Sequence, residues 1–266
     1  MSAEAKPQTA RSAALLRPGG DLAAAAARLA VRFGLALTER GAAGDLVLHL
    51  EPWAGPPGYR LHLEALGPGT PGPVAVEFVA GAAGHRRRFG GGRGQPLARA
   101  VGLKGREALS VVDLTAGLGR DGFVLASLGA QVWLVERNAA LVALLDNGIA
   151  RAAADPDTAA IAARLHLILA DGRTWLEQRS VAERPDVVYL DPMYPERRKR
   201  ALVKKEMRLL RQLVGDDLDA PQLLAAALGC ARRRVVVKRP RTAPPLPGPA
   251  PAATIASPNT RYDVYL

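Results

Sequence analysis

Five short runs of apolar residues recur along the chain after residue 109, and stretches with the spacing of helices lie between them. We expect strands at Ser110–Leu114, Gln131–Val135, Leu165–Leu169, Asp186–Leu190 and Arg234–Val237, and helices at Asp121–Leu128, Ala139–Ala154 and Ala201–Leu213. Strands that alternate with helices form a parallel sheet with helices on both faces. The pattern therefore predicts an α/β fold with a doubly wound, Rossmann-like sheet. The alternating segment Arg261–Leu266 predicts one more strand, at the edge of that sheet.

The chain before residue 84 has a different pattern. An alanine-rich helix is expected at Asp21–Val31, with Asp21 as its cap and Gly34 just beyond its last turn. Segments rich in Pro and Gly separate three short alternating runs, at Leu46–Leu50, Arg60–Glu64 and Val74–Phe78. Such runs predict a small antiparallel sheet. We therefore place a small α+β domain at residues 1–83 and the Rossmann-like domain at residues 84–266.

Composition excludes several classes of protein. The chain has 266 residues, of which 48% are hydrophobic and 23% are charged, as is typical of a globular protein with a substantial core. The single cysteine, Cys230, excludes an intramolecular disulfide and a four-cysteine zinc site. His49 and His62 have no partner at ligand spacing, so we interpret them as strand-face residues and expect no metal. The amino terminus lacks the apolar core of a secretory signal, and the uncharged stretch 242–260 is too rich in proline to span a membrane. We therefore expect a cytoplasmic protein.

Positive charge is concentrated in three segments. The formal net charge is +11, yet His85–Arg106 alone contains seven Lys or Arg residues and no acid. Glu196–Gln212 contains eight basic and two acidic residues, and Arg232–Arg241 contains six basic residues and no acid. Such clustering predicts a nucleic acid partner, and we expect the three segments to converge on one face around a pocket. The residues expected to bind it are Arg86, Arg87, Arg88, Arg93, Arg197, Arg198, Lys199, Arg200, Lys204, Lys205, Lys238 and Arg239.

A glycine-rich turn, residues 113–122, leads from the first strand of the alternating region into a helix. Glycine lets a backbone approach a ligand closely, and Gly117 and Gly119 with Gly122 match the fingerprint that holds a dinucleotide pyrophosphate. Asp113 and Asp121 flank the turn, however, and their carboxylates would repel a pyrophosphate. They suit the cationic amino-acid end of S-adenosylmethionine. We favour this second ligand, and the dinucleotide stays open.

Acidic residues also end the next two strands. Glu136 lies 23 residues after Asp113, where a carboxylate can accept hydrogen bonds from the ribose hydroxyls of either ligand. Asp171 follows the third strand, where a side-chain oxygen could accept a hydrogen bond from the amino group of adenine. Acids at three successive strand ends predict a nucleoside pocket at the carboxyl edge of the sheet.

The fourth strand runs into Asp191-Pro192-Met193-Tyr194. An acid, a proline and an aromatic residue after a buried strand match the motif of amino-directed methyltransferases, with Met193 in place of a second proline. The lone pair of an exocyclic amine is delocalised into its ring, so a carboxylate and a backbone carbonyl that accept its two N–H bonds would orient that lone pair at a methyl donor. We assign this role to Asp191 and Pro192, and we expect Tyr194 to stack on the base.

Taken together, these segments resemble the bacterial 16S ribosomal RNA guanine-N2 methyltransferase family known as RsmJ over nearly the whole chain. The resemblance is carried by residues 85–94, 113–121, 136–138, 189–195, 201–208 and 235–240. It implies a class I S-adenosylmethionine-dependent methyltransferase fold, no metal, and 16S ribosomal RNA or the small ribosomal subunit as partner. It also implies cofactor contacts at Arg120, Asp121, Glu136, Arg137, Asp171, Gly172 and Asp191.

Three other functions stay open. A methyltransferase could act on an exocyclic amine of DNA or of another RNA, because the motif permits either. A non-catalytic RNA-binding protein could keep a vestigial pocket, although intact Asp121 and Asp191 argue against decay. A nicotinamide oxidoreductase would leave the segment Asp191–Tyr194 and the basic segments without a role.

Overall fold

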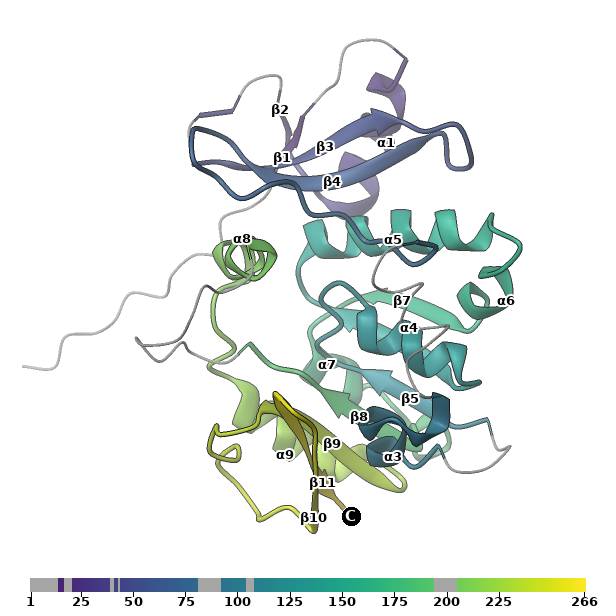
Figure 1. Ribbon diagram of the computed structural model, residues 1–266, viewed down its shortest axis with the longest axis vertical. Coiled ribbons are helices and arrows are strands. Elements are labelled where there is room, and N and C mark those ends of the chain that lie inside the picture. Colours follow the sequence, from purple (N-terminus) through teal and green to yellow (C-terminus); the bar gives the residue numbers. More distant parts are fainter. Residues whose placement is uncertain are drawn as a thin grey trace, which may run out of the picture.

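The computed structural model describes residues 14–16, 21–38, 41–42, 44–80, 92–103, 108–193 and 205–266, and these form two sheets joined by helices (Figure 1). Within those ranges the larger sheet has seven strands in the order β10-β11-β9-β8-β5-β6-β7. They are β5 Ser110–Asp113, β6 Gln131–Glu136, β7 Leu165–Leu169, β8 Val187–Leu190, β9 Arg234–Pro240, β10 Ala253–Ala256 and β11 Thr260–Tyr265. The predicted α/β sheet is confirmed.

The core of this sheet is parallel. β5 pairs in parallel with β6 and with β8, and the outer pairs β6 with β7 and β8 with β9 are parallel too. Only β11 runs antiparallel, to β9 and to β10. The expectation that the last strand forms the edge is wrong, because β10 lies outside it. Strand β10 has mostly exposed side chains, so it leaves no apolar alternation in the sequence.

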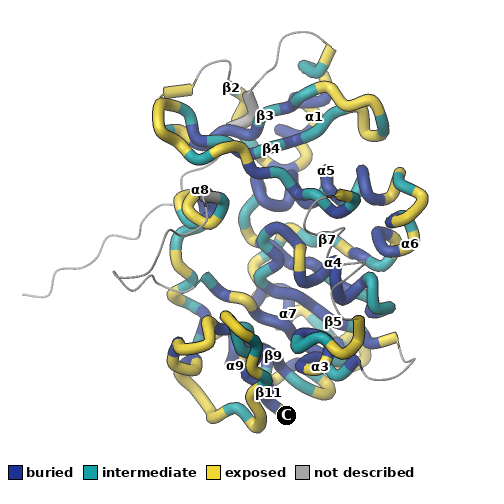
Figure 2. The backbone as a smooth tube through the Cα atoms, in the orientation of Figure 1, coloured by how far each residue is buried: buried dark blue, intermediate teal, exposed yellow. Residues whose placement is uncertain are grey.

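Helices cover both faces of the large sheet, and successive strand residues point into two separate apolar clusters. On one face lie α3 Pro96–Val101, α4 Arg120–Ser127, α5 Ala139–Ala153 and α6 Ala159–Ala162; on the other lie α7 Gly172–Glu177 and α9 Ala220–Cys230. Val111 and Val112 of β5 illustrate the alternation, since each enters a different cluster. Strands buried on both faces give the continuous apolar runs seen in the sequence, and Figure 2 shows them as the dark centre of the molecule.

The strand order reverses at β5, because β6 and β7 follow on one side of it and β8 and β9 on the other. In open α/β sheets this switch point opens a crevice at the carboxyl ends of the strands. The segments that follow β5, β6 and β8 carry the predicted site residues, so the topology brings them to one edge.

The smaller sheet has the order β2-β1-β3-β4. Its elements are β1 Ala14–Leu16, α1 Ala23–Phe33, β2 Leu37–Thr38, β3 Leu46–Pro52 and β4 Tyr59–Ala65. The pair β3 and β4 is antiparallel as expected, but β1 runs parallel to β2 and to β3, so the prediction of a wholly antiparallel sheet is wrong. Helix α1 ends at left-handed Gly34 as expected, whereas its cap position is Leu22 and not Asp21.

The run Val74–Phe78 was expected as a strand, but it forms a single bridge, Val74 to Leu63. Its alternating burial comes from packing on helices. A Cβ on Gly148 of α5 would lie 2.2 Å from Cγ1 of Val76, so the glycine permits this close approach. Phe78 stacks on Phe123 of α4 with ring centroids 4.5 Å apart. The alternation of buried and exposed residues that is typical of a strand therefore occurs here outside any sheet.

Helix α5 lies between the two sheets and is bonded to both parts of the chain (Figure 1). The Oδ1 of Asn147 accepts a hydrogen bond from the Leu61 backbone at 3.1 Å, and Arg151 forms an ion pair with Glu77 at 2.9 Å. One apolar cluster contains side chains from both sheets. The predicted boundary between residues 83 and 84 lies outside the described residues and stays a prediction.

His49 and His62 lie on neighbouring strands of the small sheet, as expected, and they are directly opposite each other in the β3–β4 register. The expectation that neither has a partner at ligand spacing is wrong, because one ligand atom each of His49, His62 and Glu64 lie within 4.8 Å of one another. Spacing along the chain could not reveal this, since the strand pairing creates it. No helix within the described ranges has the length and apolar character that a membrane span requires.

Candidate active site

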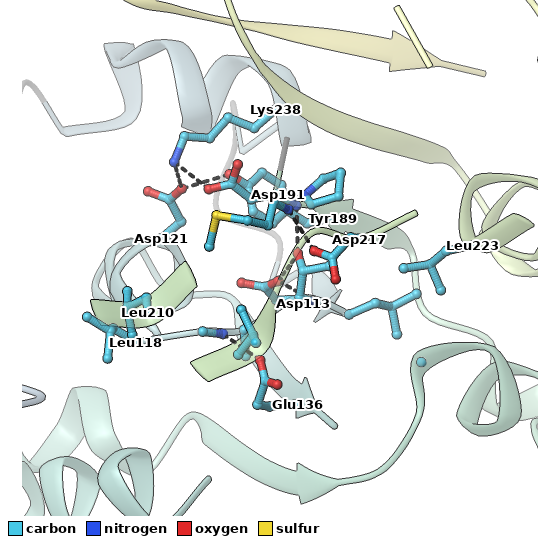
Figure 3. Close-up of a pocket in the computed structure, with 18 of the residues that line it drawn as sticks. Asp113, Leu118, Asp121, Glu136, Tyr189, Asp191, Leu210, Asp217, Leu223 and Lys238 are labelled. Atoms are coloured by element: carbon cyan, nitrogen blue, oxygen red, sulfur yellow. Dashed lines mark hydrogen bonds and ion pairs between the residues drawn. The ribbon is translucent and has the colours of Figure 1, made fainter. Parts of the chain in front are cut away.

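A pocket of about 750 Å³ opens at the carboxyl ends of β5, β6 and β8 (Figure 3). Its volume is typical of pockets that hold a nucleoside-sized ligand. Segments that are far apart in the sequence meet here. The predicted site residues that line it are Asp113, Gly117, Arg120, Asp121, Glu136, Arg137, Asp171, Gly172, Asp191, Pro192 and Lys238.

The two glycines of the turn after β5 have different tasks. Gly117 lines the pocket, and its backbone N–H donates to Glu136 Oε2 at 2.9 Å. Gly119 is not among the lining residues. It takes the left-handed conformation, with φ of 68°, at the start of α4, and a Cβ there would lie 2.6 Å from Cδ2 of Leu145. Gly119 therefore shapes the turn, and Gly117 presents backbone to the pocket.

Glu136 joins two elements of the pocket wall. Its side chain is buried, Oε2 accepts from Gly117 and Oε1 accepts from the backbone of Asn138 at 2.8 Å. Burial raises the pKa of this carboxyl, and the two backbone donors oppose the shift. Asp171 also combines two contacts. It lines the pocket, and its Oδ1 caps α7 by accepting hydrogen bonds from the backbone N–H groups of Arg173 and Thr174.

Asp113 and Thr115 tie the glycine turn to the segment after β8. Burial raises the pKa of Asp113 to about 8, and the backbone N–H of Thr115, 3.1 Å from Asp113 Oδ1, acts in the opposite direction. The Thr115 hydroxyl accepts a hydrogen bond from the Asp191 backbone at 2.6 Å. The start of the Asp191 motif is therefore fixed to the turn that follows β5. Sequence reasoning gave Thr115 no role, because a single hydroxyl in a glycine-rich turn carries no pattern.

Lys238 reaches into the pocket, between two carboxylates. Its Nζ lies 2.7 Å from Asp121 Oδ2 and 2.8 Å from Asp191 Oδ2, and the buried Tyr189 hydroxyl donates to the same Asp121 oxygen at 2.7 Å (Figure 3). Burial by itself would lower the pKa of Lys238, but Asp191 and Asp121 raise it well above its ordinary value. Two carboxylates already compensate its charge, so this pairing does not favour the expected contact between Lys238 and nucleic acid phosphate, and its role toward RNA stays a prediction.

Three other arginines of the third basic segment do not face the pocket. Arg239 is buried and donates two hydrogen bonds to the Pro244 carbonyl, at 3.0 and 3.2 Å, so it presents no charge to a polyanion. Arg232 and Arg233 precede β9, at the opposite edge of the sheet from the pocket. Arg232 donates to the Ala182 carbonyl at 2.6 Å, and Arg233 lies 3.3 Å from Asp186. Of this segment, Lys238 and the neighbours of exposed Arg241, Pro240 and Thr242, line the pocket, so the convergence holds for only part of it.

Asp217 is a pocket residue that the sequence did not indicate. Its Oδ2 accepts from the Met193 backbone at 2.6 Å, and its own backbone N–H donates to the Met193 carbonyl at 3.2 Å. Its Oδ1 pairs with Arg137, which also binds Asp219 at 2.8 Å. Asp217 thus connects the residue after Glu136 with the segment Asp191–Met193. It lies after helix α8, Lys205–Val214, in no recognisable motif.

Several predicted residues lie outside the described part of the chain: Tyr194, Arg86, Arg87, Arg88, Arg197, Arg198, Lys199, Arg200 and Lys204. Lys205 is the first residue of α8, and its side chain is likewise not described. Arg93 is exposed and donates to the Leu128 carbonyl at 3.1 Å, in the 3-10 helix Gly92–Gly94. Roles of these residues in nucleic acid binding stay predictions.

The charges of the pocket favour a cationic ligand over a pyrophosphate. Four Lys or Arg residues line it, and each is paired with a carboxylate of the chain: Arg120 with Glu206, Arg137 with Asp217, Arg211 with Asp216 and Lys238 with Asp191. Seven Asp or Glu residues line the same pocket. This donor set fits the ribose hydroxyls, the ammonium and the sulfonium of S-adenosylmethionine, and it offers a pyrophosphate little compensating charge.

Comparisons with known proteins agree with this chemistry. Residues 28–266 match the family model described as "Putative SAM-dependent methyltransferase". Proteins called ribosomal RNA small subunit methyltransferase J are similar over nearly the whole chain. The one from Thioalkalivibrio sulfidiphilus is 53% identical over 92% of this chain and 94% of its own, and one from Pseudomonas aeruginosa is 54% identical over 92% and 91%.

A solved structure also matches. The crystal structure of a SAM-dependent methyltransferase from Neisseria gonorrhoeae is 34% identical, has a TM-score of 0.72 and covers 96% of each chain. These matches confirm the resemblance found in the sequence, the class of fold and the cofactor. They give the nicotinamide oxidoreductase no support.

Proposed function

The chain belongs to the ribosomal RNA small subunit methyltransferase J family of SAM-dependent methyltransferases, and from this membership we propose that it methylates the exocyclic N2 of a guanosine in 16S ribosomal RNA. One observation carries the proposal. The Asp191-Pro192-Met193 segment after β8 and the glycine turn after β5 line the same pocket, and a direct hydrogen bond joins Asp191 to Thr115. An amine-orienting motif and a nucleoside-binding turn are thereby held at a fixed separation.

The cofactor side of the pocket is assigned to the residues at the ends of β5, β6 and β7. S-adenosylmethionine supplies an electrophilic methyl group on a sulfonium. We assign Glu136 to its ribose, Asp171 to its adenine amino group, and Asp113 with Asp121 to its cationic end. A cation beside Asp113 favours its ionised form and so opposes the burial that raises its pKa. The Gly117 backbone allows close approach, and Arg120, Arg137 and Gly172 complete the wall.

Asp191 and Pro192 act on the target amine. The Asp191 carboxylate, with 41% of its side chain exposed, accepts one N–H of the amine, and the Pro192 carbonyl accepts the other. These two bonds orient the nitrogen lone pair at the methyl group, and Tyr194 stacks on the base. Positioning and electrostatics supply most of the acceleration, because the transfer needs no protein nucleophile. The amine loses a proton after transfer, and the nearby carboxylate can accept it.

The RNA side of the proposal rests on the first two basic segments. Arg86, Arg87, Arg88 and Arg93 precede α3, and the residues from Arg197 to Lys205 lie between the Asp191 motif and the body of α8. The first segment is followed by Pro96 and Leu97, which line a smaller cavity together with Asp121 and Lys238, and the second follows the Asp191 motif of the main pocket. We propose that they bind the phosphates that flank the target guanosine.

Mass mapping of small-subunit ribosomal RNA tests the function. RNA would be compared from cells with the gene, from cells without it, and from deleted cells that carry wild-type protein or the Asp191→Ala variant. We expect one N2-methylguanosine to disappear on deletion, to return with the wild type and to stay absent with the variant. An unchanged methylation map, or loss of a methyl group from adenine or cytosine, would contradict the proposal.

A further inference from the structure

Lys238 lies beside Asp191 because of the strand register. Leu190 of β8 pairs with Val237 of β9. The next residues along the two chain segments, Asp191 just after β8 and Lys238 within β9, therefore lie side by side. Both residues line the main pocket, and Lys238 with Asp121 also lines a smaller adjoining cavity of about 350 Å³. The lysine is therefore at the boundary of two spaces.

Lys238 is held by buried Asp121 on one side and is accessible from the pocket on the other. Exposure of the side chain rises along the chain of contacts, from 9% for Asp121 to 24% for Lys238 and 41% for Asp191. An ammonium has three N–H donors, and two of those on Lys238 are directed to Asp121 and Asp191. Within the described residues the third has no acceptor, so a ligand can take it.

The two side chains together form an ordered set of hydrogen-bonding groups. Asp191 offers two carboxylate oxygens as acceptors, and Lys238 offers a donor next to one of them, 2.8 Å away. The Watson–Crick edge of guanine carries the complementary order: the N2 amine and N1–H donate, and the neighbouring O6 accepts. A lysine ammonium is a common partner of guanine O6 in nucleic acid recognition.

We propose that Lys238 is the residue that selects guanine, by donating to O6 while Asp191 accepts from N2 and N1. This inference rests on the proposed function and specifies how that site recognises its base. Adenine and cytosine do not match the hydrogen-bonding groups of Asp191 and Lys238. Each places a ring acceptor next to its exocyclic amine, and a ring nitrogen lone pair would then face a carboxylate oxygen. An unmatched buried polar group costs recognition more than a matched one adds.

The contact with Asp121 keeps Lys238 in place when it donates to a base. Asp121 holds Nζ at 2.7 Å, and Tyr189 holds Asp121 by a hydrogen bond of the same length. Both partners are buried, so they fix the lysine from the protein side. Lys238 therefore keeps its position when a base replaces part of its contact with Asp191.

The test compares two RNA substrates that differ at O6. One carries guanosine at the methylated position found by mass mapping, and the other carries 6-thioguanosine there, which keeps N2 and N1–H but has a weak acceptor in place of O6. For wild type we expect kcat/KM to fall about tenfold with the thio substrate, the equivalent of about 1.4 kcal/mol. Lys238→Met should lower kcat/KM on guanosine and bring the two substrates within about twofold of each other. Lys238→Arg, which keeps a donor, should restore part of the difference.

The ratio of the two rates separates recognition from a merely structural role. A structural defect lowers both rates equally and leaves the tenfold ratio intact, which would overturn the proposal. Equal rates for wild type on both substrates would overturn it too, whether or not the variant folds. Arg32→Met is the matched control, because it removes a cation paired with Asp146 at 2.8 Å on the far side of α5, and it should keep the wild-type ratio. If wild type methylates no ribosomal guanosine at all, the proposed function fails first, and mass mapping reports that separately.

Discussion

Replacement of Asp217 tests whether the segment after β8 must be held in place for methyl transfer. Asp217→Ala removes the acceptor of the Met193 backbone N–H, at 2.6 Å, and one of the two partners of Arg137. Met193 directly follows Asp191 and Pro192 in the chain. Loss of this contact should therefore release the residues that orient the target amine.

The structure sets the size of the effect. The bond from Met193 is a charge-assisted bond to a side chain that is 19% exposed, so its loss should cost about 1.5–3 kcal/mol of folding free energy. The contact with Arg137 contributes much less, under about 1 kcal/mol, because the arginine is 43% exposed and keeps Asp219. Burial raises the pKa of Asp217, which means that its charge is partly desolvated and offsets some of the gain. We expect a net loss of about 2 kcal/mol.

Urea unfolding and single-turnover methylation measure the two consequences. Asp217→Asn keeps an acceptor for Met193 and should lose only about 1 kcal/mol. Asp219→Ala is the matched control, because it removes the other Arg137 partner and leaves Met193 bonded. For Asp217→Ala we expect the transfer rate to fall about tenfold or more and the affinity for S-adenosylmethionine to change by less than about threefold. If Asp217→Ala were no less stable than Asp219→Ala and transferred methyl at the same rate, the positioning role would be refuted.

Of four further predictions, three concern single carboxyl groups of the site and the fourth concerns RNA binding. Asp191→Ala should abolish transfer yet leave cofactor binding by calorimetry within about threefold, and turnover near the wild-type rate would exclude amine orientation. Glu136→Ala should weaken S-adenosylmethionine and S-adenosylhomocysteine alike, by about 1–3 kcal/mol, and unchanged titrations of both would remove Glu136 from the ribose site. Burial raises the pKa of Asp113 from 3.8 to about 8, so the native state holds a proton that the unfolded state has lost, and this contribution to stability falls as pH rises between those values. Urea unfolding at about pH 5.5 and about pH 7.5 should then show Asp113→Asn gaining about 2 kcal/mol relative to wild type, and a constant difference would contradict the raised pKa. If about five basic side chains contact phosphate, the logarithm of RNA affinity should fall against the logarithm of salt concentration with a slope of about −3.5 to −4.5. Neutralising Arg86, Arg87 and Arg88 together should make this slope shallower, and an unchanged slope would show that these arginines do not contact the RNA.

Local pattern was enough to identify the large sheet and the acidic and glycine residues at the centre of the pocket. A strand buried on both faces must be apolar, a tight turn against a ligand must contain glycine, and parallel strands end at one edge. These requirements act on a few consecutive residues, so Gly117, Glu136 and Asp191 could be selected from the sequence. Their common pocket follows from the topology that the same pattern predicts.

Only the tertiary structure decided which side chain each charged group meets. Lys238 and Arg239 are adjacent in a basic segment, yet one enters the pocket and the other is buried against a carbonyl, because neighbouring strand residues point to opposite faces. The partners of Lys238 lie 117 and 47 residues away, and those of Met193 and Arg137 depend on where the chain returns after α8. Net charge and spacing are properties of the sequence, whereas the compensation of a buried charge depends on strand register and helix packing across the whole fold. That is why the sequence determined the sheet, the glycine turn and the strand-end acids, whereas only the folded chain decided that Lys238, expected at phosphate, lies beside Asp191.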